Sequence, residues 1–361
     1  MKPHNVAIAC GVAGVAAGLA AAIGIVYRKQ IKSVASLKRL TDYADGYDLY
    51  AIDIAYDYDL DRIIAADVRD DQAYIDAVLA QVLPGVPAHV QAPQFACSAF
   101  AAVDAEGRVR TGRNYDFKDD ASALLVRNHP RDGYASIGFA ALNNLSANTP
   151  LDSVAGRAAA LMGPFAQLDG VNECGVSIAV LTLDSKPCDQ DTQRPVINTS
   201  LAIRLVLDRA ATTQEAVDLL SAYDMHAMAG RDYHFFINDA AGDVRVVEWD
   251  PRDPDRAFKA TPVRQVTNFY ACYGDEVLPN QKNGELGHGK ERALVIADVL
   301  DAHAGAQDES VAWKALRAAA QDPNPEDITS NTQWSVVFDN TEPAAAITLR
   351  RHWGDVDAFA L

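Results

Sequence analysis

The stretch CSAFAAVDAEGRVRTGRNYDF, residues 97–117, decides how the chain can fold. It predicts two short strands around a tight turn, opened by Cys97 and closed by Arg-Asn-Tyr-Asp. If the strands pair, the side chains of Cys97, Arg113 and Asp116 can converge at one end of a sheet. A neighbouring guanidinium favours the thiolate, so we expect a lowered pKa for Cys97. A buried cysteine beside a structural Arg–Asp ion pair fits the same spacing.

The composition is that of an ordinary globular protein with an acidic surface. Hydrophobic residues make up 49% of the 361 residues, which allows a core of normal size in one large domain or two modest ones. The net charge of −17 argues against nucleic-acid binding, which needs clustered Lys and Arg. The five cysteines include no CxxC pair, so we expect neither a disulfide framework nor a zinc site, and at least one thiol should be free.

An uncharged N-terminal stretch, residues 6–27, is long enough to cross a bilayer as a helix. Basic residues follow it directly, whereas only Lys2 precedes it. The positive-inside rule therefore places the rest of the chain in the cytoplasm, with an extracellular location left open. We expect a single-pass membrane anchor within residues 1–32, and a cleaved signal peptide is the alternative, because small residues around 20–22 suit signal peptidase.

Residues 33–96 form a distinct segment with a Tyr- and Asp-rich stretch, then a helical pattern over 70–83 that three prolines end. From residue 97 onward, strand and helix patterns alternate. Hairpins are predicted at 97–117, 233–250 and 334–353, and helices at 199–209, 212–223 and 290–304. Antiparallel hairpins with helices grouped between them predict an α+β layered fold.

Several motifs in the same order resemble the choloylglycine hydrolase family, which includes conjugated bile salt hydrolases and penicillin V acylases and is related to the acyl-CoA:6-aminopenicillanate acyltransferases. The matching stretches are FACSAF with TGRNYDF, LDGVNECGVSIAVLTL, YHFFINDAAGDVRVVEWD, VTNFY and GKERALVIADVL. The resemblance covers residues 97–361. It implies the four-layer αββα fold of N-terminal nucleophile hydrolases, in which a cysteine is the first residue of the mature chain.

The resemblance also assigns roles residue by residue. Its implied catalytic residues are Cys97, Arg113, Asp116, Thr182, Asn268 and Arg292. Cys97 matches the nucleophile, and the side-chain amide of Asn268 matches an oxyanion-hole donor. Thr182 stands where bile salt hydrolases usually have an asparagine. The asparagine contributes a backbone N–H, which threonine also has, so the oxyanion hole is little affected, but the departure weakens the case for a bile salt substrate. The resemblance implies no metal and no organic cofactor.

Together these features predict an autoprocessed cysteine amidase that cleaves a linear N-acyl amide through a thioester. Residues 33–96 would be a pro-segment that stays bound without a covalent bond, and cleavage before Cys97 would free its amine, whose reference pKa of about 7.7–8.0 suits a general base. Loops within 117–167 would build the substrate pocket. Phe139, Met162 and Phe165 either line this pocket or belong to the core.

Other functions stay open at this point. An acyltransferase would use the same thioester, and a catalytically silent, membrane-anchored binding protein could keep the same fold. A Cys97–His234 dyad would resemble papain-type chemistry. The stretch GELGHGKE, 284–291, matches GxxxxGK but lacks the Ser or Thr that holds magnesium, so we expect no nucleotide. The sequence does not decide whether the protein forms a homo-oligomer.

Overall fold

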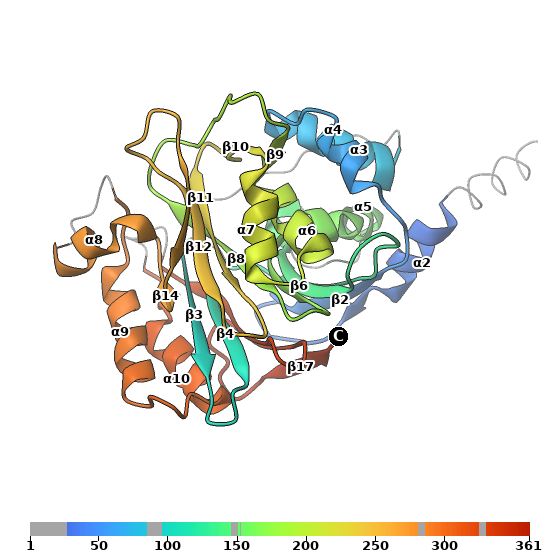
Figure 1. The fold of residues 1–361 in the computed structure, drawn as a ribbon. Helices are drawn as coiled ribbons and strands as arrows, with labels where there is room; N and C mark the ends of the chain where they lie inside the picture. Colours follow the sequence, from blue (N-terminus) through green and yellow to red (C-terminus); the bar gives the residue numbers. More distant parts are fainter. Residues whose placement is uncertain (1–26, 85–95, 146–150, 152, 281–285, 325–329) are drawn as a thin grey trace, which may run out of the picture.

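Two stacked sheets lie between two layers of helices. The structure is a computed structural model that describes residues 27–84, 96–145, 151, 153–280, 286–324 and 330–361. Figure 1 shows α9 and α10 outside one sheet and α6 and α7 outside the other, with the two sheets facing each other between them. The four-layer αββα prediction is therefore confirmed.

The larger sheet has nine strands in the order β1-β2-β5-β6-β7-β8-β11-β12-β13. They are β1 (Lys38–Arg39), β2 (Leu49–Ile54), β5 (Ala123–Asn128), β6 (Ser136–Ala141), β7 (Gln167–Asn172), β8 (Ser177–Leu183), β11 (Asp232–Asn238), β12 (Val244–Trp249) and β13 (Phe258–Pro262). The smaller sheet contains β14 (Gln265–Val266), β3 (Ala96–Val103), β4 (Val109–Asp116), β15 (Thr332–Asp339), β16 (Ala344–Leu349) and β17 (Asp357–Ala360), in this order. A separate parallel pair consists of β9 (Val196–Asn198) and β10 (Asp224–His226).

The helices outside the larger sheet are α6 (Thr199–Arg209) and α7 (Thr213–Ser221), and those outside the smaller sheet are α9 (Lys290–Asp301) and α10 (Glu309–Ala319). The others are α2 (Arg28–Ser36), α3 (Leu60–Ile64), α4 (Asp71–Val82), α5 (Val154–Ala159) and α8 (Gly274–Asn280), with short 3-10 turns η1 (Leu142–Leu145), η2 (Ala160–Phe165) and η3 (Ala271–Tyr273). All three predicted hairpins and the predicted helices are present. Thr212 is the N-cap of α7: its hydroxyl accepts a hydrogen bond from the backbone N–H of Glu215.

The 97–117 stretch forms the predicted hairpin, β3 and β4, at the centre of the smaller sheet. Its side chains alternate between two hydrophobic clusters. Cys97 and Ala99 belong to the core between the sheets, whereas Phe100 packs in the second cluster with residues of α9 and α10. This alternation follows from the two-residue period of a strand and turns the Cys97 side chain toward the larger sheet.

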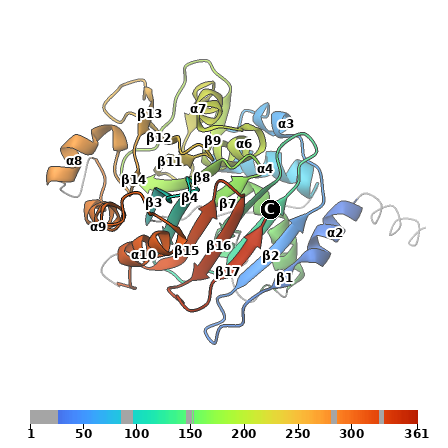
Figure 2. The same ribbon diagram turned by 60° about the horizontal axis from the view of Figure 1, so that its bottom comes forward.

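The N-terminal segment is built into the larger sheet. Its β2 pairs in parallel with β5, from Leu49↔Ala123 to Ile54↔Asn128, and β1 adds the edge strand. Figure 2 shows β1 and β2 side by side at this edge. The predicted helix after them is confirmed as α4, whereas β1 and β2 were not predicted from the sequence.

The predicted anchor, residues 6–27, lies outside the described residues except for Tyr27. Within the part of the chain that the structure describes, no helix has both the length and the hydrophobicity needed to span a bilayer.

Candidate active site

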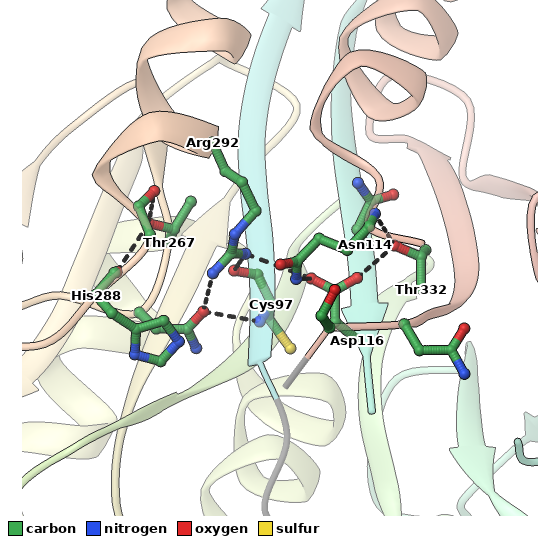
Figure 3. A network of polar contacts seen from close by, with 12 residues as sticks. Cys97, Asn114, Asp116, Thr267, His288, Arg292 and Thr332 are labelled. Carbon is green, nitrogen blue, oxygen red and sulfur yellow. Dashed lines mark hydrogen bonds and ion pairs between the residues drawn. The ribbon is translucent and has the colours of Figure 1, made fainter. Parts of the chain in front are cut away.

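Cys97 lies near the start of β3, where two side chains hold its backbone. Its N–H donates to Oδ1 of Asn268 at 2.9 Å, and its carbonyl oxygen accepts from Nη1 of Arg292 at 2.6 Å. The side chain itself is fully buried. Figure 3 shows Arg292 reaching from its helix toward Cys97, with Asp116 beside them. The fold thus brings together residues that the sequence separates by almost 200 positions.

Asn268 follows β14 and links three parts of the site. Pairing of β14 with β3, with Val266 opposite Ala99, carries the asparagine to the start of β3. Its Oδ1 accepts from Nη2 of Arg292 at 2.8 Å as well as from Cys97, so the amide oxygen faces these two donors. Its Nδ2 donates to the carbonyl oxygen of Thr182 at 2.9 Å and lies 3.3 Å from the threonine hydroxyl. Because two donors converge on Oδ1, the orientation of this amide is determined.

Arg292 is placed by the start of α9. Gly289, the N-cap of that helix, has φ +88°, a left-handed conformation that favours glycine. A Cβ at this position would lie 2.5 Å from Nη2 of Arg292 and 2.7 Å from Oγ1 of Thr267. The guanidinium therefore occupies space that only a glycine leaves open.

Asp116 lies on the helix side of β4, next to the backbone of Cys97 in the strand register. Its carboxylate accepts from Oγ1 of Thr332 at 2.6 Å and from Nε2 of Gln321 at 2.7 Å, and it lies 3.4 Å from Nη1 of Arg292. Burial raises the pKa of Asp116, while Arg292, Thr332 and Gln321 oppose that rise. Thr332 and Gln321 were not predicted from the sequence, since neither belongs to a recognisable motif.

Arg113 lies on the opposite face of β4 and does not pair with Asp116. Its Nε is 2.9 Å from Oδ2 of Asp169, a residue of β7 in the other sheet, and both side chains are fully buried. Its Nη2 donates to the carbonyl oxygen of Val180 at 3.2 Å. The predicted convergence of Cys97, Arg113 and Asp116 is therefore wrong, because residues 113 and 116 point to opposite faces of the strand. The alternative, an Arg–Asp ion pair within the hairpin, does not form either, because the partner of Arg113 comes from another sheet.

The thiol of Cys97 is not activated in the uncut chain. Burial raises its pKa to about 12, and the positive charge of Arg113 opposes this only in part. The predicted lowering of this pKa is therefore wrong for the chain in which Ala96 and Cys97 are still joined. Desolvation of the thiolate outweighs its attraction to the guanidinium.

His234 is held by a different partner. Its Nδ1 lies 3.2 Å from Oε2 of Glu248, and both side chains are fully buried. Within the described part of the chain, no hydrogen bond joins His234 to Cys97. The structure therefore offers a structural role for this histidine, and no contact supports a Cys97–His234 dyad.

The residues expected in the substrate pocket are part of the core. Phe139, Met162 and Phe165 are all buried among the hydrophobic residues between the sheets and under the N-terminal segment. Phe165 packs edge-on against Tyr58, with ring centroids 4.9 Å apart. Among the residues that the structure describes, no group of three or more His, Cys, Asp or Glu could hold a metal ion.

Two facing sheets between helical layers, with a cysteine at the start of a central strand, define the N-terminal nucleophile hydrolase class of fold. Solved structures similar to this chain agree with this class of fold. Penicillin V acylase from Agrobacterium tumefaciens is 19% identical over 73% of this chain and 86% of its own, with a TM-score of 0.53. A mutant conjugated bile acid hydrolase from Clostridium perfringens is 15% identical over 73% of this chain and 92% of its own, with a TM-score of 0.57.

The sequence also matches a family directly. Residues 103–352 match the family model of acyl-coenzyme A:6-aminopenicillanic acid acyl-transferase. The chain belongs to this family, and the predicted relationship to choloylglycine hydrolases and penicillin V acylases is confirmed. No curated protein matches the chain.

Proposed function

We propose that the protein is a cysteine amidase that hydrolyses the C–N bond of a linear N-acyl amide. The observation that carries this proposal is the set of contacts around Cys97. Asn268 and Arg292 bind its backbone, and Asp116 lies beside them. An acyl-transfer site needs a nucleophile, a base and an oxyanion donor, and this cluster supplies candidates for all three once Cys97 has a free amine.

The first reaction is cleavage of the chain itself. The thiol of Cys97 attacks the carbonyl carbon of Ala96, and the S–C bond forms as the C–N bond between the two residues breaks. The thiol proton moves to the departing nitrogen, which becomes the amine of Cys97. Water then hydrolyses the thioester, giving a carboxylate on Ala96 and restoring the thiol. The N–H of Cys97 already points at Asn268, which would orient the new amine.

In the mature enzyme this amine acts as the general base. It takes the thiol proton as sulfur attacks the substrate carbonyl, and it later protonates the leaving amine. Asp116 orients the amine, and Arg113 stabilises the thiolate. The Asn268 N–H that donates to the Thr182 hydroxyl in the uncut chain turns to the oxyanion and stabilises it together with the backbone N–H of Thr182. One such donor contributes about 3–4 kcal/mol in comparable enzymes.

The two chains produced by this cleavage stay together without a covalent bond. The parallel pairing of β2 with β5 supports this, because it joins the N-terminal segment to the catalytic part over six residue pairs. Side chains support it too: the hydroxyl of Tyr58 donates to Asp208 at 2.8 Å, and that of Tyr74 donates to the carbonyl oxygen of Phe165 at 2.5 Å. Residues 6–27 then tether the pair to a membrane, with the catalytic part in the cytoplasm.

An acyltransferase is the second candidate, and the family match to acyl-coenzyme A:6-aminopenicillanic acid acyl-transferase favours it. Both activities share the thioester on Cys97 and differ only in whether water or an amine resolves it. Adding a free amine during turnover separates them: a hydrolase releases the free acid, whereas an acyltransferase forms the new amide.

The proposal is tested by a turnover screen with the matched variant Cys97→Ala. The panel contains penicillin V, N-acyl amino acids, N-acylethanolamines and glyco- and tauro-conjugated bile salts. We expect turnover of a linear N-acyl amide by the wild type and none by the variant, and a clear preference for bile salts would overturn the substrate class. Thiol labelling checks the silent-protein alternative, which predicts equally slow labelling of all cysteines rather than one fast reaction at Cys97.

A further inference from the structure

Asp169 is a buried carboxylate that reaches from one sheet to the arginine of the other. Its Oδ2 lies 2.9 Å from Nε of Arg113, and neither side chain has any exposed surface. A buried guanidinium without a counter-charge costs several kcal/mol. Asp169 supplies the counter-charge for Arg113 in the space between the sheets.

Three elements fix the carboxylate of Asp169. Oδ1 accepts from the backbone N–H of Phe139 on β6 at 3.2 Å, and Oδ2 accepts from Nε1 of Trp334 on β15 at 3.2 Å. The ion pair with Arg113 adds β4. Because β6 and β7 belong to one sheet and β4 and β15 to the other, the carboxylate cannot move without repacking the space between the sheets.

The guanidinium that Asp169 holds faces the same side as the nucleophile. In the β3–β4 register Cys97 pairs with Tyr115 and Ala99 pairs with Arg113, and directly opposite residues share a face. The Arg113 guanidinium carbon lies 5.1 Å from the centre of the Tyr115 ring and 5.6 Å from that of Trp334. Among the described residues its Nη1 has no hydrogen-bond partner, so this N–H is left for an acceptor such as a thiolate.

We propose that Asp169 is a positioning residue for the reaction of Cys97: it holds the Arg113 guanidinium on the nucleophile's side of the sandwich and acts only through Arg113. The inference rests on the proposed amidase function of Cys97. The other charged or titratable groups near the thiol are Tyr115 and Asp116 on β4 and Arg292 on α9. Arg113 is the strongest of the groups that lower the pKa of Cys97, so losing its position should raise that pKa.

The test measures the ionisation of Cys97 in the mature enzyme. The pH dependence of its modification by iodoacetamide is followed by mass spectrometry of the Cys97 peptide. We expect Asp169→Asn to raise the apparent pKa of Cys97 by about one. At neutral pH kcat should fall about tenfold with KM little changed, and activity should recover at alkaline pH. Asp169→Glu, which keeps the charge, should retain a pKa close to that of the wild type.

A matched control separates positioning from folding. Asp208→Asn removes the carboxylate of another buried pair, Arg204–Asp208, whose atoms lie 2.7 Å apart. This variant should lose stability but leave the pKa of Cys97 unchanged. An unchanged or lowered pKa of Cys97 in Asp169→Asn overturns the proposal.

Double variants keep the test decisive if Asp169→Asn does not fold. Arg113→Gln with Asp169→Asn removes both charges and leaves no unpaired ion. Compared with Arg113→Gln alone, it should show the same pKa of Cys97, and a different value overturns the claim that Asp169 acts through Arg113. The readout needs no substrate, so a failed turnover screen would refute the amidase function without affecting this measurement.

Discussion

Replacing Gly289 by alanine should disable the site while leaving the fold intact. The added Cβ would lie 2.5 Å from Nη2 of Arg292, far inside van der Waals contact. The guanidinium is the free end of a flexible side chain, so it moves rather than the backbone. It then loses its bonds to the Cys97 carbonyl, at 2.6 Å, and to Asn268, at 2.8 Å.

The size of the effect follows from these bonds. A hydrogen bond to a charged group contributes about 1.5–3 kcal/mol, so losing even one lowers kcat/KM about 10- to 100-fold. The left-handed conformation of residue 289 adds a separate cost of about 1–2 kcal/mol to stability when it carries a side chain. Gly305→Ala is the matched control, because Gly305 has φ +76° and nothing within 4 Å of an added Cβ.

The assay compares the two variants in kcat/KM on the best N-acyl amide, in the fraction of chain cleaved before Cys97, and in the denaturant midpoint. Both should lose similar stability, and only Gly289→Ala should lose cleavage and turnover. A folded Gly289→Ala protein whose turnover stays within twofold of Gly305→Ala would refute the role given to Arg292.

Three further predictions follow from individual contacts. His234→Gln should keep turnover, because the histidine pairs with Glu248; loss of activity in a folded variant would revive the dyad. Tyr58→Phe removes a partly buried hydrogen bond at 2.8 Å, so the two chains should separate at a lower urea concentration in size-exclusion runs, and an unchanged concentration would contradict this. Burial raises the pKa of Asp169 from 3.8 to about 6, so its contribution to stability is largest below pH 3.8 and is lost as the pH rises through about 6. The comparison uses the uncut Cys97→Ala protein with and without Asp169→Asn. The free energy of unfolding of the protein that keeps Asp169, relative to the one that carries Asp169→Asn, should fall from pH 4 to pH 7. A difference that does not change with pH in urea titrations would refute this.

Local pattern and the family resemblance together predicted much of the site. The strand period and the tight turn place Cys97 and Asp116 at one end of a hairpin, whereas Asn268 and Arg292 were assigned only through short motifs that resemble those of the family. The structure brings these four residues together within hydrogen-bond distance of one another in a single network. Each of them lies in a stretch whose residues can be recognised without knowing the fold.

The parts of the site that the sequence did not predict depend on contacts between segments far apart in the chain. Thr332 and Gln321 reach Asp116 across more than 200 positions, and Asp169 reaches Arg113 across the gap between two sheets. No periodicity within a strand reveals which residue of another sheet faces it. The raised pKa of Cys97 has the same origin, since burial is a property of the packed layers rather than of the hairpin.

The structure of the N-terminal segment also depends on contacts that local sequence pattern does not reveal. Its Tyr- and Asp-rich stretch is predicted to stay bound to the catalytic part, but the sequence did not predict that it does so through a strand, β2, that pairs in parallel with β5. Parallel pairing joins strands far apart in the chain and leaves no turn signal between them.

The central claim is that the amine of Cys97 is the catalytic base, and one measurement tests it most directly. Intact-protein mass spectrometry with N-terminal sequencing is run on active wild-type protein and on Cys97→Ala. We expect a chain that begins at Cys97 in the wild type and an uncut chain in the variant. An active wild-type enzyme whose Ala96–Cys97 bond is intact would contradict it.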